Sequence, residues 1–326
     1  MATFTLVGCA RTPAVEPQTE NFYGMCDASA VIALNKDLFV AGDDEDSVLR
    51  VFSRSRGGTA VHEFNLARFL RLGAQNEADL EGSARLGERI YWITSHGNNR
   101  KGKEQESRQR FFAVIAQTNG GSVRINPVGE PYTRLLDDLL AEPSLRPFNL
   151  HATLTLPPKT PGALNIEGLA ATAEGHLLLG FRNPVPHGKA LIVPLLNPAD
   201  LVEGRRPRFG APQLIDLSGD GIRSIERWGN GYLIIAGSID GKGKSRLYKW
   251  EGGTSKPYLL PDVDFSGINP EAISVIEHDG GSELLVVSDD GTRKVNGVEC
   301  KQLKDPMQKS FRAVAVPLAP QLAAQP

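Results

Sequence analysis

The sequence predicts an all-β fold, a β-propeller with five blades, with six blades as the alternative. Three observations lead to this prediction. A short acidic motif recurs along the 326 residues, each copy begins a series of short runs rich in β-branched and aromatic residues, and turn residues separate the runs. Most copies are about fifty residues apart, a period typical of propeller blades, whereas helical repeats are shorter.

The motif is clearest in three segments that align without a gap. These are residues 79–84 (DLEGSA), 165–170 (NIEGLA) and 269–274 (NPEAIS), and each precedes an apolar run that stops at polar residues. Two weaker copies, one near residue 27 and one near residue 223, complete a set of five units. The marked positions of the units are Asp27, Glu81, Glu167, Arg223 and Glu271.

Each unit is expected to supply four strands. In the first unit these are 29–34, 38–41, 48–53 and 60–66. Strands at 111–117 and 122–128 complete the second unit, the third ends near 213–217, and the last has its third strand at 311–316. The missing fourth strand of the last blade is predicted to be residues 3–8, because an N-terminal strand there closes the ring and removes an exposed sheet edge.

One spacing, between the second and third units, is longer than the others. Within it, residues 132–145 carry leucines at helical spacing (Leu135, Leu136, Leu139 and Leu140), which predicts a helix in the region 130–146. A Pro-rich segment follows. We interpret residues 131–164 as an insertion between the second and third blades of a single domain that spans residues 1–326.

Composition limits the classes of partner. The chain has 36 basic and 38 acidic residues, a balance that argues against a nucleic-acid partner or an anionic membrane surface. No apolar run is long enough to span a bilayer. The three cysteines, Cys9, Cys26 and Cys300, are interpreted as too few and too far apart for a disulfide framework. A reducing compartment, the cytoplasm, is therefore the expected location.

The repeat also predicts a site. In a propeller the first strand of each blade lines the central channel and the second returns to the same face, so the starts of the first strands and the ends of the second strands should meet there. The candidate ligand-binding residues are Asp27, Glu81, His96, Glu167, Arg182, Asn183, Arg223 and Glu271.

Several carboxylates round one opening would repel one another unless something offsets their charge. Calcium, which binds six to eight oxygen ligands, is the candidate cation. Its predicted ligands are Asp43, Glu81, Glu167, Glu271 and Asp289. Two alternatives stay open: the Arg223 guanidinium could neutralise the carboxylates instead, or the marked side chains could simply cap strand ends.

The motif resembles that of a bacterial family catalogued as domain-of-unknown-function family 3616, together with the stretches 180–184 (GFRNP) and 189–194 (KALIVP). The resemblance covers most of the chain and implies a β-propeller without an assigned activity. A more distant resemblance is to phytase-like and esterase-like propellers, in which calcium ions and basic residues hold a phosphate ester. Glu81, Glu167 and Glu271 match that motif, whereas Asp27 and Arg223 depart from it.

Two functional classes follow. The protein could be a binding module whose acidic and polar face holds a small molecule, a cation or a protein partner. Alternatively, it could be a metal-assisted hydrolase of a phosphate ester or lactone, with Arg182 or Arg223 orienting an anionic substrate. The sequence leaves open whether the protein is an enzyme.

Overall fold

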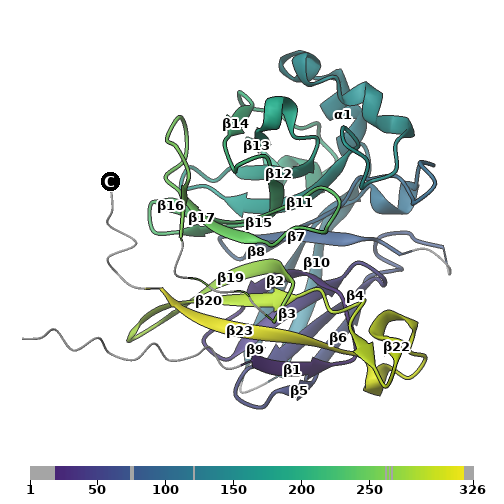
Figure 1. Cartoon of the computed structure of the whole chain (residues 1–326), viewed down its shortest axis with the longest axis vertical. Helices are drawn as coiled ribbons and strands as arrows, with labels where there is room; N and C mark the ends of the chain where they lie inside the picture. The colour runs from purple at the N-terminus through teal and green to yellow at the C-terminus, as the bar shows by residue number, and fades with distance from the viewer. Residues whose placement is uncertain are drawn as a thin grey trace, which may run out of the picture.

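The computed structural model describes residues 19–318, except for 74–76, 120–121, 261–262, 264 and 266. The chain forms a five-bladed β-propeller built from five sheets whose neighbouring strands are antiparallel, except for one short parallel pair at the edge of the last blade. Figure 1 shows the inner strands of the blades in the middle of the molecule. The five-blade prediction is confirmed, and the six-blade alternative is wrong.

The strands of each blade follow in chain order from the channel outward, except in the last blade. Blade one contains β2 (Ala28–Ala33), β3 (Leu38–Asp43), β4 (Val48–Ser53) and β6 (His62–Asn65). Blade two contains β7 (Leu80–Leu86), β8 (Arg89–Thr94), β9 (Phe111–Asn119) and β10 (Ser122–Tyr132). Blade three contains β11 (Asn165–Ala171), β12 (Leu177–Asn183), β13 (Ala190–Leu195) and β14 (Gln213–Ile215). Blade four contains β15 (Gly221–Trp228), β16 (Gly231–Gly237), β17 (Arg246–Trp250) and β18 (Tyr258–Leu259).

Blade five joins the two ends of the chain. Its order is β19 (Pro270–His278), β20 (Gly281–Ser288), β23 (Ser310–Leu318) and β1 (Thr19–Tyr23), with β5 (Gly58–Thr59) at the edge. An N-terminal strand therefore closes the ring, as the sequence predicts. The segment was wrong, because β1 occupies the place assigned to residues 3–8, which lie outside the described residues.

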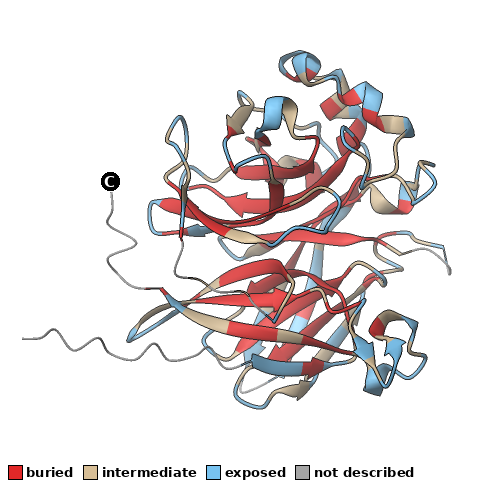
Figure 2. Ribbon diagram, viewed as in Figure 1, coloured by how far each residue is buried: buried red, intermediate tan, exposed pale blue. Residues whose placement is uncertain are grey.

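The core lies between the blades. Each inner strand packs against the inner strands of the two neighbouring blades, and a separate cluster of buried apolar side chains fills each of the five spaces between blades. Figure 2 shows the buried residues concentrated in these strands and the exposed residues in the peripheral loops. This packing fixes the inner strands, and with them the side chains at the channel.

The insertion between β10 and β11 contains α1 (Leu135–Ala141) and the 3-10 helices η2 (Pro143–Phe148) and η3 (Leu150–Thr155). The predicted helix is confirmed but is shorter than 132–145, because Tyr132 still belongs to β10 and Pro143 begins a 3-10 turn. The leucines of α1 pack into the core cluster between blades two and three.

The remaining short elements lie in loops. They are η1 (Glu106–Arg108), η4 (Pro186–Gly188), α2 (Pro198–Val202), β21 (Lys294–Val295), β22 (Val298–Glu299), η5 (Cys300–Gln302) and η6 (Pro306–Gln308). The sequence reading missed α2, which packs against β9 and β10 of the neighbouring blade. No helix of the described residues is long and apolar enough to cross a membrane.

The cysteine prediction was wrong. Cys26 and Cys300 form a disulfide, with 5.9 Å between their Cα atoms, although 274 residues separate them in the sequence. Ring closure brings the start of blade one against the long loop of blade five, so distance along the chain was no guide. Because stable disulfides are typical of oxidising compartments, the cysteine argument for a cytoplasmic location no longer holds.

Candidate functional site

A β-bulge near the start of every inner strand shapes the channel. In each blade the ladder between the first and second strands skips one residue of the inner strand. The bulged residues are Ser29, Glu81, Glu167, Arg223 and Glu271. A bulge leaves its extra residue out of the regular pairing and re-aims the side chain. Four of the five marked residues therefore occupy one structural position.

Asp27 does not occupy that position, which corrects the sequence alignment. The bulge of blade one is at Ser29, two residues later. Asp27 instead corresponds to Asp79, Asn165 and Asn269, which stand two residues before the bulged glutamates. The alignment was misplaced because blade one has no carboxylate at its bulge.

The glycine that follows two of the glutamates has a packing role. A Cβ on Gly82 would lie 3.1 Å from the Glu167 carbonyl oxygen and 3.0 Å from the Ile93 side chain. A Cβ on Gly168 would lie 2.8 Å from Ile222 of blade four. In each Glu-Gly pair the glutamate side chain faces the channel. The glycine that follows it lets the backbone of the inner strand pack closely against the next blade.

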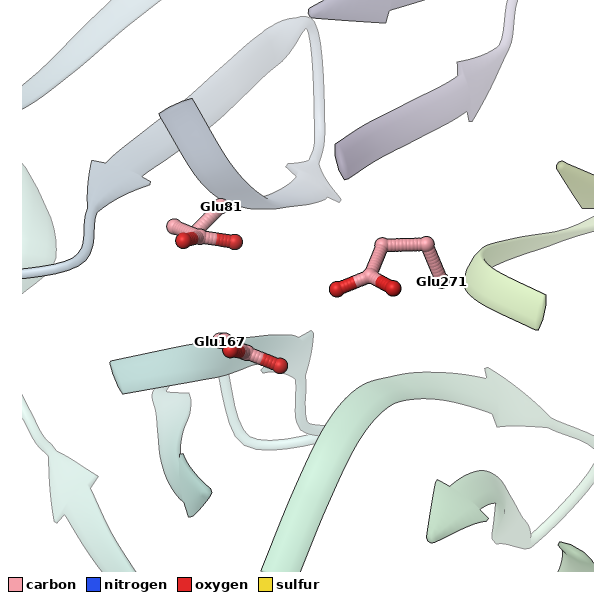
Figure 3. Close-up of side chains that lie close together, drawn as sticks. All are labelled: Glu81, Glu167 and Glu271. Atoms are coloured by element: carbon pink, nitrogen blue, oxygen red, sulfur yellow. The ribbon is translucent and has the colours of Figure 1, made fainter. Parts of the chain in front are cut away.

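Three carboxylates converge at the channel end where the inner strands begin. Glu81, Glu167 and Glu271 each offer an oxygen, and these oxygens all lie within 4.8 Å of one another. Figure 3 shows the three side chains extending from separate strands into a common space. They are 8%, 2% and 6% exposed, respectively, so solvent can do little to screen their repulsion.

Two arginines offset part of this charge. Arg182 Nη1 donates to Glu167 Oε1 at 2.7 Å, and the Arg223 guanidinium forms an ion pair with Glu271 through Oε2. Asn165 adds a hydrogen bond of 2.6 Å to Glu167 Oε1. Arg182 also donates to the Ser238 carbonyl oxygen. Both arginines are buried, so the two ion pairs are fixed parts of the channel wall.

Glu81 has no such partner. It forms no ion pair among the described residues, and burial, followed by the charge of Glu167, raises its pKa well above the usual range. Burial also lowers the pKa of Arg223 to about 10, assisted by the neighbouring charge of Arg182. The three-carboxylate group therefore carries one more acid than it has guanidinium partners.

A second acidic group lies beside the first, where blade five meets blade one. Asp27 and Asp289 form an isolated β-bridge, and burial together with a hydrogen bond to Asp289 raises the pKa of Asp27 to about 10. Burial and the charges of nearby acids raise the pKa of Asp43 and of Asp44 well above the usual range. The three-carboxylate group does not include the predicted ligands Asp43 and Asp289.

Two candidate residues have other roles. The His96 ring contacts the Thr94 carbonyl oxygen at 2.8 Å, and burial lowers the His96 pKa to about 4. Asn183 donates to the carbonyl oxygens of Pro158 and Thr160, so it anchors the Pro-rich part of the insertion.

Two contributors to the site, Asn165 and Asp44, are not among the predicted site residues. Asn165 stands two residues before Glu167, at the position that Asp79 and Asn269 share, and this recurrence was the available signal. Asp44 was hidden in an acidic run in which nothing distinguished one carboxylate from the next.

One solved structure supports the fold, and a second is similar at a lower score. The major Malassezia sympodialis allergen Mala s 1 is 10% identical over 92% of this chain and 96% of its own, with a TM-score of 0.51. Trypanosoma rangeli sialidase in complex with 2,3-difluorosialic acid is 12% identical over 81% of this chain and 43% of its own, with a TM-score of 0.42. No curated protein matches the chain. The protein family described as "protein of unknown function (DUF3616)" matches residues 27–125 and 118–296, and the chain belongs to that family.

Proposed function

We propose that the protein is a binding module whose acidic channel end holds a divalent cation of the calcium type. One observation carries this proposal. Glu81, Glu167 and Glu271 converge from three blades, with an oxygen of each within 4.8 Å of the others, and in the described part of the chain only two guanidinium groups pair with them. Two oxygens that both contact a calcium ion at about 2.4 Å are at most about 4.8 Å apart, so the spacing suits one shared ion.

The arginines position the glutamates without using all of their oxygens. Arg182 and Asn165 both bind Oε1 of Glu167, and Oε2 of the same carboxylate is buried without a hydrogen-bond partner. Arg223 pairs with Oε2 of Glu271, which leaves Oε1 of that carboxylate for a ligand. A buried carboxylate oxygen without a partner is unfavourable, and a bound cation would relieve this cost.

The surroundings add more uncompensated acid. Among the described residues, Asp27, Asp43, Asp44 and Asp289 form no ion pair, and each of them interacts electrostatically with at least one other acid of this group. Burial raises the pKa of Asp27, Asp43 and Asp44, so a bound cation would displace protons from those carboxyls that it contacts. The carboxylates so formed would orient the water molecules that complete a calcium shell.

The geometry favours binding over hydrolysis of a phosphate ester or lactone. A hydrolase of this kind would need Arg182 or Arg223 to hold an anionic substrate, but both guanidinium groups already contact glutamates. Arg182 is further held by the Ser238 carbonyl oxygen and Arg223 by the Asn269 side chain. An anion would have to displace a buried carboxylate to reach either of them.

Thermal unfolding in calcium and in EDTA tests the proposal. A ligand that binds only the folded state adds about 2.7 kcal/mol of stability at a hundredfold excess over its dissociation constant, so calcium should raise the melting temperature by several degrees. Glu81→Gln should lose this shift, because the amide has the shape of the acid but cannot ionise to the carboxylate that a cation binds. The exposed Glu88→Gln is the matched control and should keep it.

The competing explanation is that a proton, and not a cation, neutralises Glu81, the carboxylate without a guanidinium partner. If Glu81 simply stays protonated, calcium and EDTA curves will superimpose for the wild type, and Glu81→Gln will melt at the wild-type temperature in both. That pattern would rule out the cation site.

A further inference from the structure

The far end of the channel has a different character from the acidic end. There the inner strands β7, β11 and β15 end round a hollow of about 430 Å³, whose lining includes Arg85, Thr172, Glu226 and Arg227. Arg85 follows Glu81 by four residues on one extended strand, so it lies about 13 Å further along the channel wall. The hollow is therefore separate from the three-carboxylate group.

Two guanidinium groups face this hollow without an acid paired to them. Neither Arg85 nor Arg227 forms an ion pair among the described residues. Arg85 is half-buried and donates to the Ala33 carbonyl oxygen at 3.0 Å. Arg227 is exposed, and its electrostatic neighbour Glu174 is exposed as well. For the half-buried Arg85, partial removal from water without a counter-charge is unfavourable, and an anionic ligand would supply the missing charge.

Glu226, the one acid in the lining of this first hollow, does not supply that charge. Glu226 is partly buried and accepts a backbone hydrogen bond from Val275. Burial raises the pKa of Glu226 to about 8, although Arg85 acts in the opposite direction. At neutral pH this carboxyl is mostly protonated, so it leaves both arginines uncompensated and can itself donate a hydrogen bond to an anion.

A second hollow continues from the first. It has a volume of about 420 Å³, lies between blades three and four, and shares Thr172, Ala173 and Arg227 with the first hollow. Its walls include the side chains of Leu178, Pro194, Tyr232 and Trp250, together with the polar side chains of Glu174, His176 and Glu251. Each hollow is within the size range of small-molecule sites, and the second adds aromatic and aliphatic surface, from Tyr232, Trp250 and Leu178, to the arginines of the first.

We propose that this end of the channel binds a small organic anion, whose carboxylate or phosphate lies between Arg85 and Arg227 and whose apolar part extends between blades three and four. Arg227 supplies long-range attraction and one side of the anion contact. Arg85 and Glu226 form the inner wall. This site is distinct from the proposed cation site at the opposite end, and it does not depend on that proposal.

Titration calorimetry of the full chain with defined probes tests the site. The probes are phenyl phosphate, benzoate and inorganic phosphate, with phenol as the uncharged probe, all in EDTA so that no divalent cation takes part. We expect phenyl phosphate or benzoate to bind, inorganic phosphate to bind more weakly, and phenol not to bind. The stronger of the two aromatic anions identifies the preferred charged group.

The variants decide whether the arginines carry the binding. Arg227→Gln and Arg85→Gln should each weaken the stronger aromatic anion at least about tenfold. Arg124→Gln removes an exposed arginine from the outer strand β10 and should change nothing. Because Arg227 is exposed, its variant should also keep the wild-type melting temperature. The proposal is overturned if the wild type binds none of the anions at millimolar concentration, or if the Arg227 and Arg124 variants bind alike.

Discussion

At the residue scale, Gly82 shows how closely the blades meet round the site. A methyl group at this position would lie 3.0 to 3.1 Å from Ile93, from the Glu167 carbonyl oxygen and from Leu169, and two of these three belong to the next blade. We expect Gly82→Ala to destabilise the protein by about 1–3 kcal/mol, because the inner strands must separate to accept it. Denaturant unfolding measures the loss.

The control is Gly280→Ala, at an exposed turn where the nearest atoms, in the His278 ring, are 3.4 Å from the added carbon. Replacement of glycine restricts the unfolded chain and contributes about 0.4–1 kcal/mol of stability where the fold tolerates it. If both alanine variants unfold at the same denaturant concentration, the glycine of the Glu-Gly motif is not there for packing.

The sequence could predict individual site residues only where the motif repeats. Glu81, Glu167 and Glu271 share a pattern and were correctly placed on one face. Their partners were harder to assign: Arg223 was considered as a general counter-charge, but it pairs with Glu271 while Arg182 pairs with Glu167. Such pairings depend on the positions of the β-bulges and on which blades are neighbours, and the amino-acid sequence shows neither directly.

At the element scale, closure of the ring depends on a strand that is largely exposed. Within β1 only Phe22 is buried, and its ring packs against Phe39, Phe52 and Phe311, with centroids 5.0 to 5.4 Å apart. This side chain joins blade five, which contains β1 and β23, to the core it shares with blade one.

We expect Phe22→Ala to lower the free energy of unfolding by about 3–5 kcal/mol, through lost apolar burial and the cavity left between the blades. Tyr23→Ala, at the adjacent exposed position, should change it by about 0.5 kcal/mol or less. Chemical denaturation of both variants measures the difference. Equal losses would show that β1 contributes through its backbone ladder alone.

The strands inside the blades were predictable and the closing strand was not. Strands such as β4 and β9 carry long apolar patterns between turns, so their positions agree with the sequence prediction within a few residues. In β1 (TENFY) only one side chain faces the core, which is too little for a periodic signal. Residues 3–8 (TFTLVG) have a stronger apolar pattern, and closure of the ring predicts an N-terminal strand without specifying which segment forms it.

At the scale of the whole molecule, the two ends of the channel differ: three glutamates converge at one end, whereas Arg85 and Arg227 line the hollow at the other. The formal charge of −2 conceals this polarity, since it averages 36 basic and 38 acidic residues. The acidic end could be predicted because its residues mark the starts of repeated strands. The basic end could not, because Arg85 and Glu226 stand at different distances from the bulges of their strands and meet only through the fold.

The stability of the folded protein is expected to depend on pH through the contact between Asp27 and Asp289, where the ring closes. In the folded state the Asp27 pKa is raised to about 10, whereas an aspartate in an unfolded chain titrates near pH 3.9. The folded protein therefore binds a proton that the unfolded chain has released. This contribution to stability is complete below about pH 4 and is lost as the pH rises toward 10. Glu81, Asp43 and Asp44, whose pKa values are also raised, act with the same sign.

We expect the melting temperature in EDTA to fall between pH 6 and pH 9, and Asp27→Asn to make this fall shallower. The amide can donate to Asp289 without a bound proton, so the variant should match the wild type near pH 5 and melt higher at pH 9. Asp240→Asn is the control: this exposed acid has a lowered pKa, so its contribution changes only at acid pH, and its curve should parallel the wild type. If the Asp27→Asn curve also runs parallel to the wild type from pH 6 to pH 9, Asp27 and Asp289 do not share a proton in the folded protein. The prediction would then be wrong.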